Sequence, residues 1–373
     1  MFLGYANHWV LTPIIPLYVL DLGGSAFLAG LVLLTFAVPS FSVRPVMGHL
    51  CDRWNAAGVL AVGLVMLALG TLAFLLPFVA MLFVGSVVRG LGWAGVNTGG
   101  YTTLAAAAPA ARRGEAAGYY TSVTTSASIA FPALGLWLVA GPGGFQAVFA
   151  LSALVALLGL PVALALARTA REKKSAATAA PAGATGLIER GVLLATGLNL
   201  CSSLVMPSVM AFLPLYARSL GIANIGWFYV LAGVTSIVVR PVLGKKSDAI
   251  GRGPGIALGL TAQLIGLALI LAANDIELIL AGGFFVAIGM AMIGSTTTAL
   301  AMDLADPASR GRSMATFSMS FQLGAGGGAL ISGALADLVG LRGMYAGSIV
   351  ITAAGIVLLA AAWKMLPPPG RRG

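Results

Sequence analysis

The chain has 373 residues, of which 59% are hydrophobic and 9% charged, and its formal net charge is +10. A typical soluble domain carries about 25% charged residues, so a water-soluble fold is excluded and the bilayer is the expected solvent. Nucleic-acid binding is excluded as well, because the positive charge falls in short segments between apolar stretches.

Twelve apolar segments follow one another along the chain, each close to the ~20 residues that cross a ~30 Å hydrocarbon core. The sequence therefore predicts an all-α membrane protein with twelve transmembrane helices. No cleavable signal is expected, because no small-residue cleavage site follows the first segment. The spans are placed at residues 1–20, 27–48, 57–76, 78–105, 115–140, 146–167, 189–217, 224–244, 254–273, 277–302, 312–336 and 343–364.

The distribution of Lys and Arg predicts the orientation, because cytoplasmic loops of membrane proteins carry an excess of these residues. With both termini in the cytoplasm, 18 of the 21 Lys and Arg residues lie in inner segments. Only Arg218 and Arg342 lie in outer loops, and Arg89 lies within a span. The expected location is the plasma membrane, crossed many times, with cytoplasmic termini.

The longest hydrophilic run, "ARTAREKKSAATAAPAGATG", lies between the sixth and seventh spans and is typical of a linker. It predicts an N-terminal six-helix bundle over residues 1–168 and a cytoplasmic linker over 169–187. A second six-helix bundle follows over 188–366, and a cytoplasmic tail over 367–373.

The two halves repeat each other at a nearly constant spacing. "PLY", "RPV" and a longer loop segment each occur twice, at offsets of 198, 196 and 198 residues. Such a repeat indicates a duplicated six-helix unit, which is an architecture of secondary transporters with a substrate site near the membrane midplane. The pairs begin at Pro16 and Pro214, at Arg44 and Arg240, and at Pro109 and Pro307.

Several motifs resemble the major facilitator superfamily, and the resemblance covers essentially the whole chain. "GHLCDR" matches the family's Gly-x-Leu-x-Asp-Arg signature between the second and third spans, although "WNAAG" replaces the usual basic residues after it. "RGLGWAG", which begins at Arg89, resembles the family's second motif. The signature residues are Gly48, Leu50, Asp52 and Arg53 in the first half and Gly244, Asp248, Gly251 and Arg252 in the second.

The fifth span resembles the efflux branch of this family, whose Gly-rich motif surrounds a proline. Pro132 and Gly135 match that motif, whereas Phe131 stands where glycine is usual. The whole pattern is most similar to bacterial drug and metabolite exporters, including the opine-metallophore exporters. The resemblance implies the major facilitator fold, alternating access and proton-coupled efflux of a small amphipathic drug or metabolite.

The repeated loop motif is interpreted as a gate. An aspartate is favourable at a helix N-terminus, and the resemblance implies that Asp52 meets the eleventh span and Asp248 the fifth. Each carboxylate would then tie the two halves together on the cytoplasmic side. The alternative is that Asp52, Arg53, Asp248 and Arg252 are ordinary loop charges.

Arg89 and His8 are the candidate residues for the substrate or proton pathway. A charge at bilayer depth costs ~2.5–3.5 kcal/mol on insertion scales, and Arg89 lies roughly 17 Å into the fourth span at 1.5 Å per residue. Arg89 is expected to bind an anionic substrate group or to modulate a proton carrier; a structural arginine is the alternative. His8 is the candidate proton carrier, because imidazole titrates near neutrality, with Asp303 as second choice.

Further polar and aromatic side chains are expected to line a cavity, because the resemblance places their spans around it. The candidate pathway residues besides Arg89 and His8 are Asn7, Trp93, Asn97, Tyr119, Asn199 and Gln322, and Tyr120, Ser202 and Phe321 are related candidates.

Two other functions stay open at this stage, a proton-coupled importer of a sugar or other metabolite and an integral-membrane lipid-handling protein or enzyme. No enzyme is expected, because no nucleotide-binding loop or His-Glu-x-x-His motif occurs. Neither catalytic residues, a cofactor nor a metal is expected. The expected partners are a small-molecule substrate, protons and the lipid bilayer, with the chain acting as a monomer.

Overall fold

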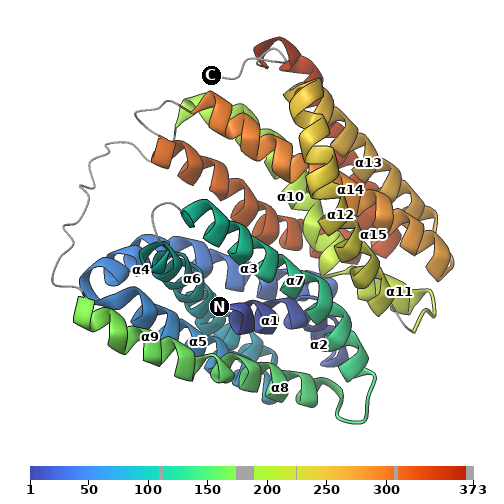
Figure 1. Ribbon diagram of the computed structural model, residues 1–373. Coiled ribbons are helices and arrows are strands. Elements are labelled where there is room, and N and C mark those ends of the chain that lie inside the picture. Colours follow the sequence, from blue (N-terminus) through green and yellow to red (C-terminus); the bar gives the residue numbers. More distant parts are fainter. Residues whose placement is uncertain (109–111, 174–188, 224, 306–309, 367–373) are drawn as a thin grey trace. The chain divides into compact units, whose positions relative to one another are not determined.

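Helices form every regular element in the part of the chain that the computed structural model describes, which is residues 1–108, 112–173, 189–223, 225–305 and 310–366 (Figure 1). By its contacts the chain divides into two units. The first is Met1–Gly24 with Leu31–Ala182, and the second is Ser25–Gly30 with Gly183–Gly373.

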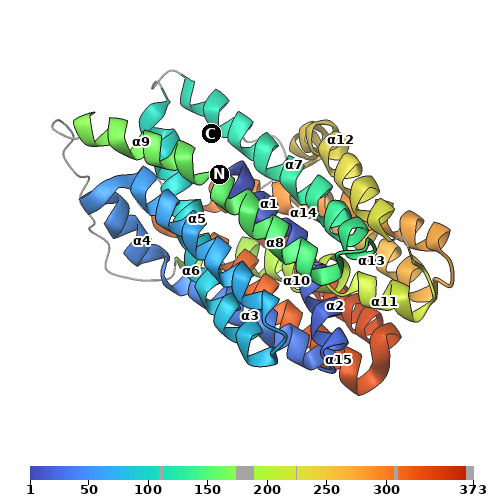
Figure 2. The ribbon, with the colours of Figure 1, turned by 90° about the horizontal axis from the view of Figure 1, so that it is seen from below.

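The first unit is built from helices of the N-terminal half. In Figure 2, α8 and α9 follow one another alongside α5, with which both are in contact. The helices are α1 (Phe2–Leu11), α2 (Ile14–Asp21), α3 (Ala26–Ser42), α4 (Arg44–Leu50), the π-helical turn η1 (Cys51–Asn55), α5 (Ala56–Leu72), the 3-10 turn η2 (Ala73–Leu75), α6 (Val79–Ala107), α7 (Arg113–Val139), α8 (Gly144–Leu158) and α9 (Leu160–Lys173).

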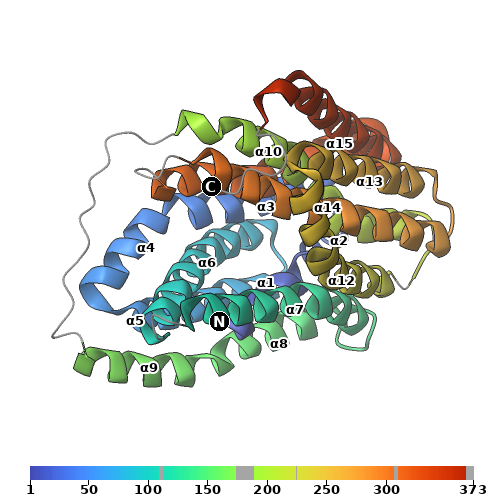
Figure 3. The same ribbon diagram turned by 45° about the horizontal axis from the view of Figure 1, so that its top comes forward.

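The second unit contains the remaining helices. Figure 3 shows α12, α13 and α14 side by side, in agreement with their contacts. The elements are the 3-10 turn η5 (Arg190–Val192), α10 (Leu193–Met210), α11 (Leu213–Ser219), α12 (Gly226–Ile250), α13 (Arg252–Ala272), α14 (Ile276–Leu304), α15 (Arg310–Ala361) and the 3-10 turn η6 (Trp363–Met365).

Eight helical segments of the described chain are long and apolar enough to cross a membrane, against twelve predicted spans. The first span is interrupted at Thr12 and Pro13, where proline has no N–H to continue the helix. The second span contains a shorter apolar helix, Ala26–Ser42, and the eighth lies within α12, Gly226–Ile250. The eleventh and twelfth run together as α15, whose direction changes at Gly340 (φ 78°, ψ 168°). The twelve predicted segments are therefore all helical.

The predicted linker begins later than its sequence suggests, because α9 continues to Lys173. Residues 174–187 of that linker and the predicted tail at 367–373 lie outside the described residues.

Glycine lets two helices touch backbone to backbone in each unit. A Cβ on Gly63 of α5 would lie 2.7 Å from the Gly92 carbonyl oxygen and 2.7 Å from the Val96 nitrogen of α6. In the second unit, a Cβ on Gly266 of α13 would lie 2.5 Å from the Gly282 oxygen of α14. Close approach through small residues is a main source of helix association in lipid, where burial of apolar surface gives no advantage.

These glycines repeat at the spacing of the sequence motifs. Two pairs join α5 to α6 and two join α13 to α14, and corresponding members are 196 or 197 residues apart. The duplication seen in the loops therefore extends to the contacts that hold the helices together. The pairs are Gly63 with Gly92 and Gly70 with Gly85 in the first unit, and Gly259 with Gly289 and Gly266 with Gly282 in the second.

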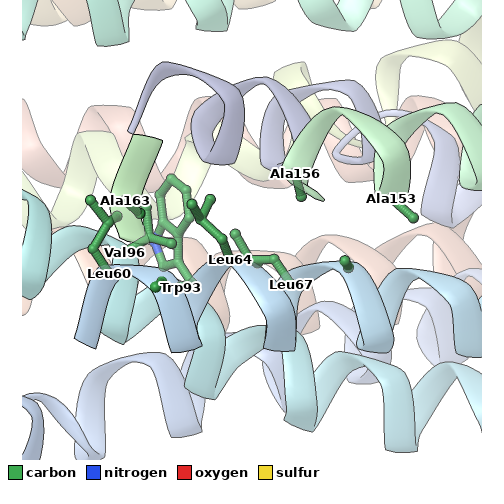
Figure 4. Packing of buried hydrophobic residues seen from close by; sticks show 10 residues of the cluster. Leu60, Leu64, Leu67, Trp93, Val96, Ala153, Ala156 and Ala163 are labelled. Carbon is green, nitrogen blue, oxygen red and sulfur yellow. The ribbon is translucent and has the colours of Figure 1, made fainter. Parts of the chain in front are cut away.

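The apolar cores of the two units correspond in the same way. In Figure 4, Leu60, Leu64 and Leu67 of α5 lie close to Trp93 and Val96 of α6. The second core uses α10, α13, α14 and α15. The corresponding core residues, 196 or 197 positions apart, are Leu60 and Ile256, Leu64 and Leu260, Val96 and Ile293, and Ala163 and Leu359.

The first turn of α3 belongs to the second unit, a division that the sequence did not indicate. The Asp337 carboxylate accepts hydrogen bonds from the backbone N–H groups of Ala26 (3.0 Å) and Phe27 (2.9 Å). A carboxylate at this position satisfies amides that have no partner within the helix and interacts favourably with the helix dipole. Gly30 and Gly333 bring the two helix backbones close at the same place.

The glycine contacts predict a difference between two Gly→Ala variants of α13 and α14. Gly266→Ala should lower the free energy of unfolding by about 1–3 kcal/mol, because the new methyl group meets fixed backbone atoms. Gly294→Ala is the matched control, since a Cβ there has nothing within 4 Å. Thermal unfolding of the purified variants in detergent measures both, and equal midpoints would contradict the packing argument.

Candidate functional site

A stripe of polar and aromatic side chains runs along one face of α6 in the first unit. Arg89, Trp93 and Asn97 follow at intervals of four residues, and this spacing places them on the same side of the helix. Tyr5 and His8 of α1 contact this stripe. Phe36 of α3 contacts it as well, so three helices contribute to one cluster.

Arg89 is buried in this cluster, with 1% of its surface exposed. Its guanidinium carbon lies 5.3 Å from the ring centroid of Phe36 and 5.4 Å from that of Phe74, within the range of cation–π attraction. Nε and Nη2 have no hydrogen-bond partner among the described residues. An unpaired buried cation is costly, so this group is well suited to receive an anion.

Gly70 makes the position of Arg89 possible. A Cβ on Gly70 would lie 2.6 Å from Cγ of Arg89 and 2.6 Å from the Gly85 carbonyl oxygen. The arginine stem therefore lies against the bare backbone of α5, and the glycine contact between α5 and α6 sets the depth of the charge.

His8 stacks between two aromatic rings. Its ring centroid is 4.2 Å from that of Trp93 and 5.0 Å from that of Phe36, with interplanar angles of 29° and 18°. The imidazole is half-buried and lies within electrostatic range of Arg89. The structure thus brings together the two residues that the sequence selected for the substrate or proton pathway.

A hydrogen-bonded group of phenols and an amide continues the cluster. The Tyr5 hydroxyl donates to Oδ1 of Asn97 (2.7 Å) and lies 3.3 Å from the Tyr120 hydroxyl. The amide of Asn97 in turn donates to the Trp93 carbonyl oxygen (3.0 Å). The rings of Tyr101 and Tyr120 are 4.1 Å apart.

Two predicted pathway residues of the first unit lie elsewhere. Asn7 is completely buried, and its amide donates to Thr71 Oγ1 (3.1 Å) and to the Ser152 carbonyl oxygen (2.9 Å). It therefore joins α1 to α5 and α8. Tyr119 is 67% exposed, and its neighbour Tyr120 is the tyrosine that contacts Tyr5.

Asn199, a predicted residue of the second unit, belongs to a separate polar network. The Asn199 amide donates to Ser320 Oγ (2.8 Å) and Ser203 Oγ (3.3 Å), and its carbonyl accepts from Thr297 Oγ1 (3.1 Å). This bonding joins α10, α14 and α15 and satisfies the side chain. Gln322 is half-buried.

Ser202 donates to Oε1 of Gln263 (2.8 Å), and the amide nitrogen of Gln263 has no partner among the described residues. Phe321, also expected at the cavity, is 44% exposed.

The first copy of the predicted gating motif lies on α4 and the π-helical turn. Asp52 and Arg53 are exposed, and a Cβ on Gly48 would have nothing within 4 Å. The reversal of the chain occurs at Asn55, whose side chain accepts from the amides of Ala57 (2.9 Å) and Gly58 (3.4 Å). The gating role of these residues stays a prediction.

In the second copy, Arg252 forms an ion pair with Asp303 through Nε and Oδ2 at 2.7 Å. This pair engages Asp303, which the sequence offered as an alternative proton carrier. The surroundings of Gly244 and the side chain of Asp248 lie outside the described part of the structure.

The efflux-type motif lies on α7. Pro132 lies within that helix. A Cβ on Gly135 would lie 2.8 Å from the Val10 carbonyl oxygen, so Gly135 allows α7 to approach α1. Its part in the transport direction stays a prediction.

Among the residues that the structure describes, no group of three or more His, Cys, Asp or Glu side chains is placed to hold a metal ion.

Sequence reasoning missed four members of the cluster, Tyr5, Phe36, Phe74 and Tyr101. Tyr5 had a usable signal, because it lies three residues before His8 on the same helix face. Tyr101 extends the four-residue spacing of Arg89, Trp93 and Asn97. Phe36 is an apolar residue within an apolar helix, and its sequence context carries no such signal.

Comparison with known proteins decides the family. The sequence model of the Major Facilitator Superfamily matches residues 1–224 and, a second time, residues 195–373. The chain belongs to the major facilitator superfamily. It is an integral membrane protein of twelve transmembrane helices in two six-helix bundles, and the members of this family to which it is similar are transporters.

The staphylopine export protein of Staphylococcus aureus is 25% identical over 377 residues, which is 98% of this chain and 94% of the relative. An uncharacterised MFS-type transporter of Methanocaldococcus jannaschii is 23% identical over 346 residues, 90% of this chain and 89% of the relative. The crystal structure of a bacterial homologue of the human lysosomal transporter Spinster has the same fold, with a TM-score of 0.79, 15% identity, and coverage of 99% of this chain and 96% of that one.

Proposed function

We propose that this major facilitator transporter exports a small amphipathic molecule that carries an acidic group, and that inward proton flow drives the export. The observation that carries the proposal is the buried guanidinium of Arg89, which lacks partners for Nε and Nη2 and is flanked by aromatic rings. Export is supported by the similarity to the staphylopine export protein of Staphylococcus aureus, which extends over 98% of this chain.

The chemistry of recognition follows from the surroundings of Arg89. An acidic group of the substrate would pair with Nε and Nη2, because charge-assisted hydrogen bonds are the strong ones. The rings of His8, Phe36 and Trp93 would contact the apolar part of the substrate. Binding there would remove the cost of an unpaired cation, so a substrate with an anion would be favoured over a neutral molecule of the same shape.

The transport cycle that we propose is alternating access around a site near the midplane. The protein would act as a monomer in the plasma membrane with both termini in the cytoplasm, the orientation favoured by its Lys and Arg distribution. Transport direction is measured in right-side-out and inverted vesicles, with and without an uncoupler. Substrate loss driven by a proton gradient supports export, whereas accumulation in right-side-out vesicles identifies an importer.

Replacement of Arg89 tests the substrate site. Arg89→Ala should reduce transport in proteoliposomes at least 100-fold, because the substrate anion loses the one cation that is fully buried among the described residues. Arg168→Gln is the control, since it removes an exposed cation of α9 in the same unit. Unfolding midpoints close to that of the original protein show that the variants fold. Full transport by Arg89→Ala would remove this residue from the mechanism.

His8 is proposed as the proton carrier, because it lies beside Arg89 and titrates near neutrality in water. His8→Gln should keep substrate exchange across the membrane and lose at least nine-tenths of the additional transport driven by a pH gradient. Both rates come from the same proteoliposomes. An unchanged response to the gradient would assign the proton to another group.

We also propose that Asp52 acts as a latch of the cytoplasmic gate, by analogy with the family motif that it matches. Asp52→Asn should increase the population of inward-open molecules, since a neutral amide interacts more weakly with a helix N-terminus. Spin-label distances between the cytoplasmic ends of the two halves report this population, with Asp275→Asn, at the outer start of α14, as control. Identical distance distributions in Asp52→Asn and the original protein would rule out the latch.

A further inference from the structure

The polar cluster around Arg89 ends at a second cation that the proposed function does not use. Arg44 opens the repeated "RPV" segment, and its sequence context is that of an ordinary cytoplasmic loop charge. In the structure it is the first residue of α4 and is half-buried. Its position is therefore at the edge of the helical bundle of the first unit and not in an open loop.

Electrostatic interactions and ring contacts relate Arg44 to Arg89 through side chains of the first unit. Arg44 lies within electrostatic range of the Tyr5 hydroxyl. The Tyr5 ring lies 4.7 Å from that of Trp93. Trp93 stacks on His8, which in turn lies within electrostatic range of Arg89. Each step is made within the first unit.

Helix geometry gives the direction and length of this cluster. Phe36, which lies against Arg89, and Ser40 belong to α3, which ends at Ser42, and Arg44 begins α4 directly after Val43. Backbone hydrogen bonds from Val43 to Pro39 and from Met47 to Val43 join the two helices. Eight residues at a helical rise of 1.5 Å place the Arg44 backbone about 12 Å from that of Phe36. In the predicted orientation Arg44 is the cytoplasmic end.

Arg44 also has hydrogen-bonding capacity available. Among the described residues its single hydrogen bond runs from Nε to the Ser40 carbonyl oxygen, at 3.3 Å. The terminal nitrogens Nη1 and Nη2 donate to none of the described groups. These two nitrogens form the edge of a guanidinium that pairs with carboxylate or phosphate oxygens in a bidentate manner.

The side chains between the two cations have a suitable character for an elongated ligand. Trp93, Tyr120 and Tyr5 supply aromatic rings there, and polar atoms come from the Tyr5 hydroxyl and the Asn97 amide, which are bonded to each other. A long apolar or aromatic body with a few polar atoms would match this lining. A second acidic group at the far end of such a body would reach Arg44.

We propose that Arg44 is a second anion-binding residue of the substrate site, and that the transported molecule is an elongated amphipathic acid with one acidic group for Arg89 and another for Arg44. This inference rests on the proposed function, because it adds a second anchor to the Arg89 site. It defines a substrate class, the long organic diacids, that a site with one arginine would not select.

Binding of α,ω-dicarboxylic acids to the full-length protein in nanodiscs tests the inference. A series of increasing chain length is compared by calorimetry at pH 8, where both acids are ionised, with the half methyl ester of each member. The affinity of the diacids should reach a maximum at an intermediate length. At that length the half ester should bind at least about 10-fold more weakly, because it lacks one charge-assisted contact.

Variants assign the second contact. Arg44→Gln should lower the affinity for the diacid to that for the half ester. The affinity for the half ester itself should change less than twofold. Arg44→Lys should retain part of the preference for the diacid over its half ester, and Arg168→Gln should retain all of this preference. If Arg44→Gln does not fold, the ratio of the affinities for diacid and half ester in the original protein still tests whether a second anion is bound.

The possible failures are distinct. Equal affinities of diacid and half ester, the absence of diacid binding at every length, or an equal loss of both ligands in Arg44→Gln would each overturn the second anchor. If the two affinities are equal, or if Arg44→Gln weakens both ligands equally, loss of ligand binding in Arg89→Ala would still support a site for a single anion at Arg89. Full transport by Arg89→Ala would instead overturn the proposed function, whatever the diacids do.

Discussion

The close backbone contact between α5 and α6 is the constraint on which the site depends. Gly70 and Gly85 leave no side chains between the two helices, and the stem of Arg89 occupies the space beside Gly70. Trp93, one turn further along α6, is held by the leucines of α5 in the apolar core and at the same time stacks on His8. Helix packing and ligand recognition therefore share the same residues.

Arg89 is unusual because its surroundings compensate the charge only in part. Two phenylalanine rings face the guanidinium, but Nε and Nη2 have no acceptor among the described residues. Asn199 in the second unit is the opposite case, since three neighbouring hydroxyl groups satisfy its amide. Both are buried polar residues in membrane helices. The satisfied side chain stabilises its unit, and the unsatisfied one is available for a ligand.

The sequence predicted much of the fold, because hydrophobicity, charge asymmetry and the internal repeat all respond to the membrane. It also selected Arg89, His8, Trp93 and Asn97, since a charge or amide in an apolar helix is conspicuous. It did not distinguish Asn7 from His8 or Tyr119 from Tyr120. Neighbouring residues point in different directions around a helix, and only the packing of α1 and α7 determines which of each pair contacts α6.

The interruptions of the helices lie beside prolines. Pro13 is at the break in the first span, and Pro207 and Pro214 flank Ala211 and Phe212, where α10 gives way to α11. The assignment of residues 25–30 to the second unit depends on Asp337, which is more than 300 residues away along the chain. Pairings across such separations are set by tertiary structure and leave no local pattern.

The glycine pairs have a consequence for how the two halves diverged after duplication. Where backbones touch, neither helix tolerates a side chain, so substitution is blocked at those positions in both copies. Residues that face lipid or ligand were under no such restriction and became different, as Arg89 and its counterpart Val286 illustrate, at the offset of 197 residues that also relates the glycines of α6 and α14. The duplication is therefore visible in the helix contacts as well as in the loop motifs, whereas the position of the buried Arg89 is occupied by valine in the second half.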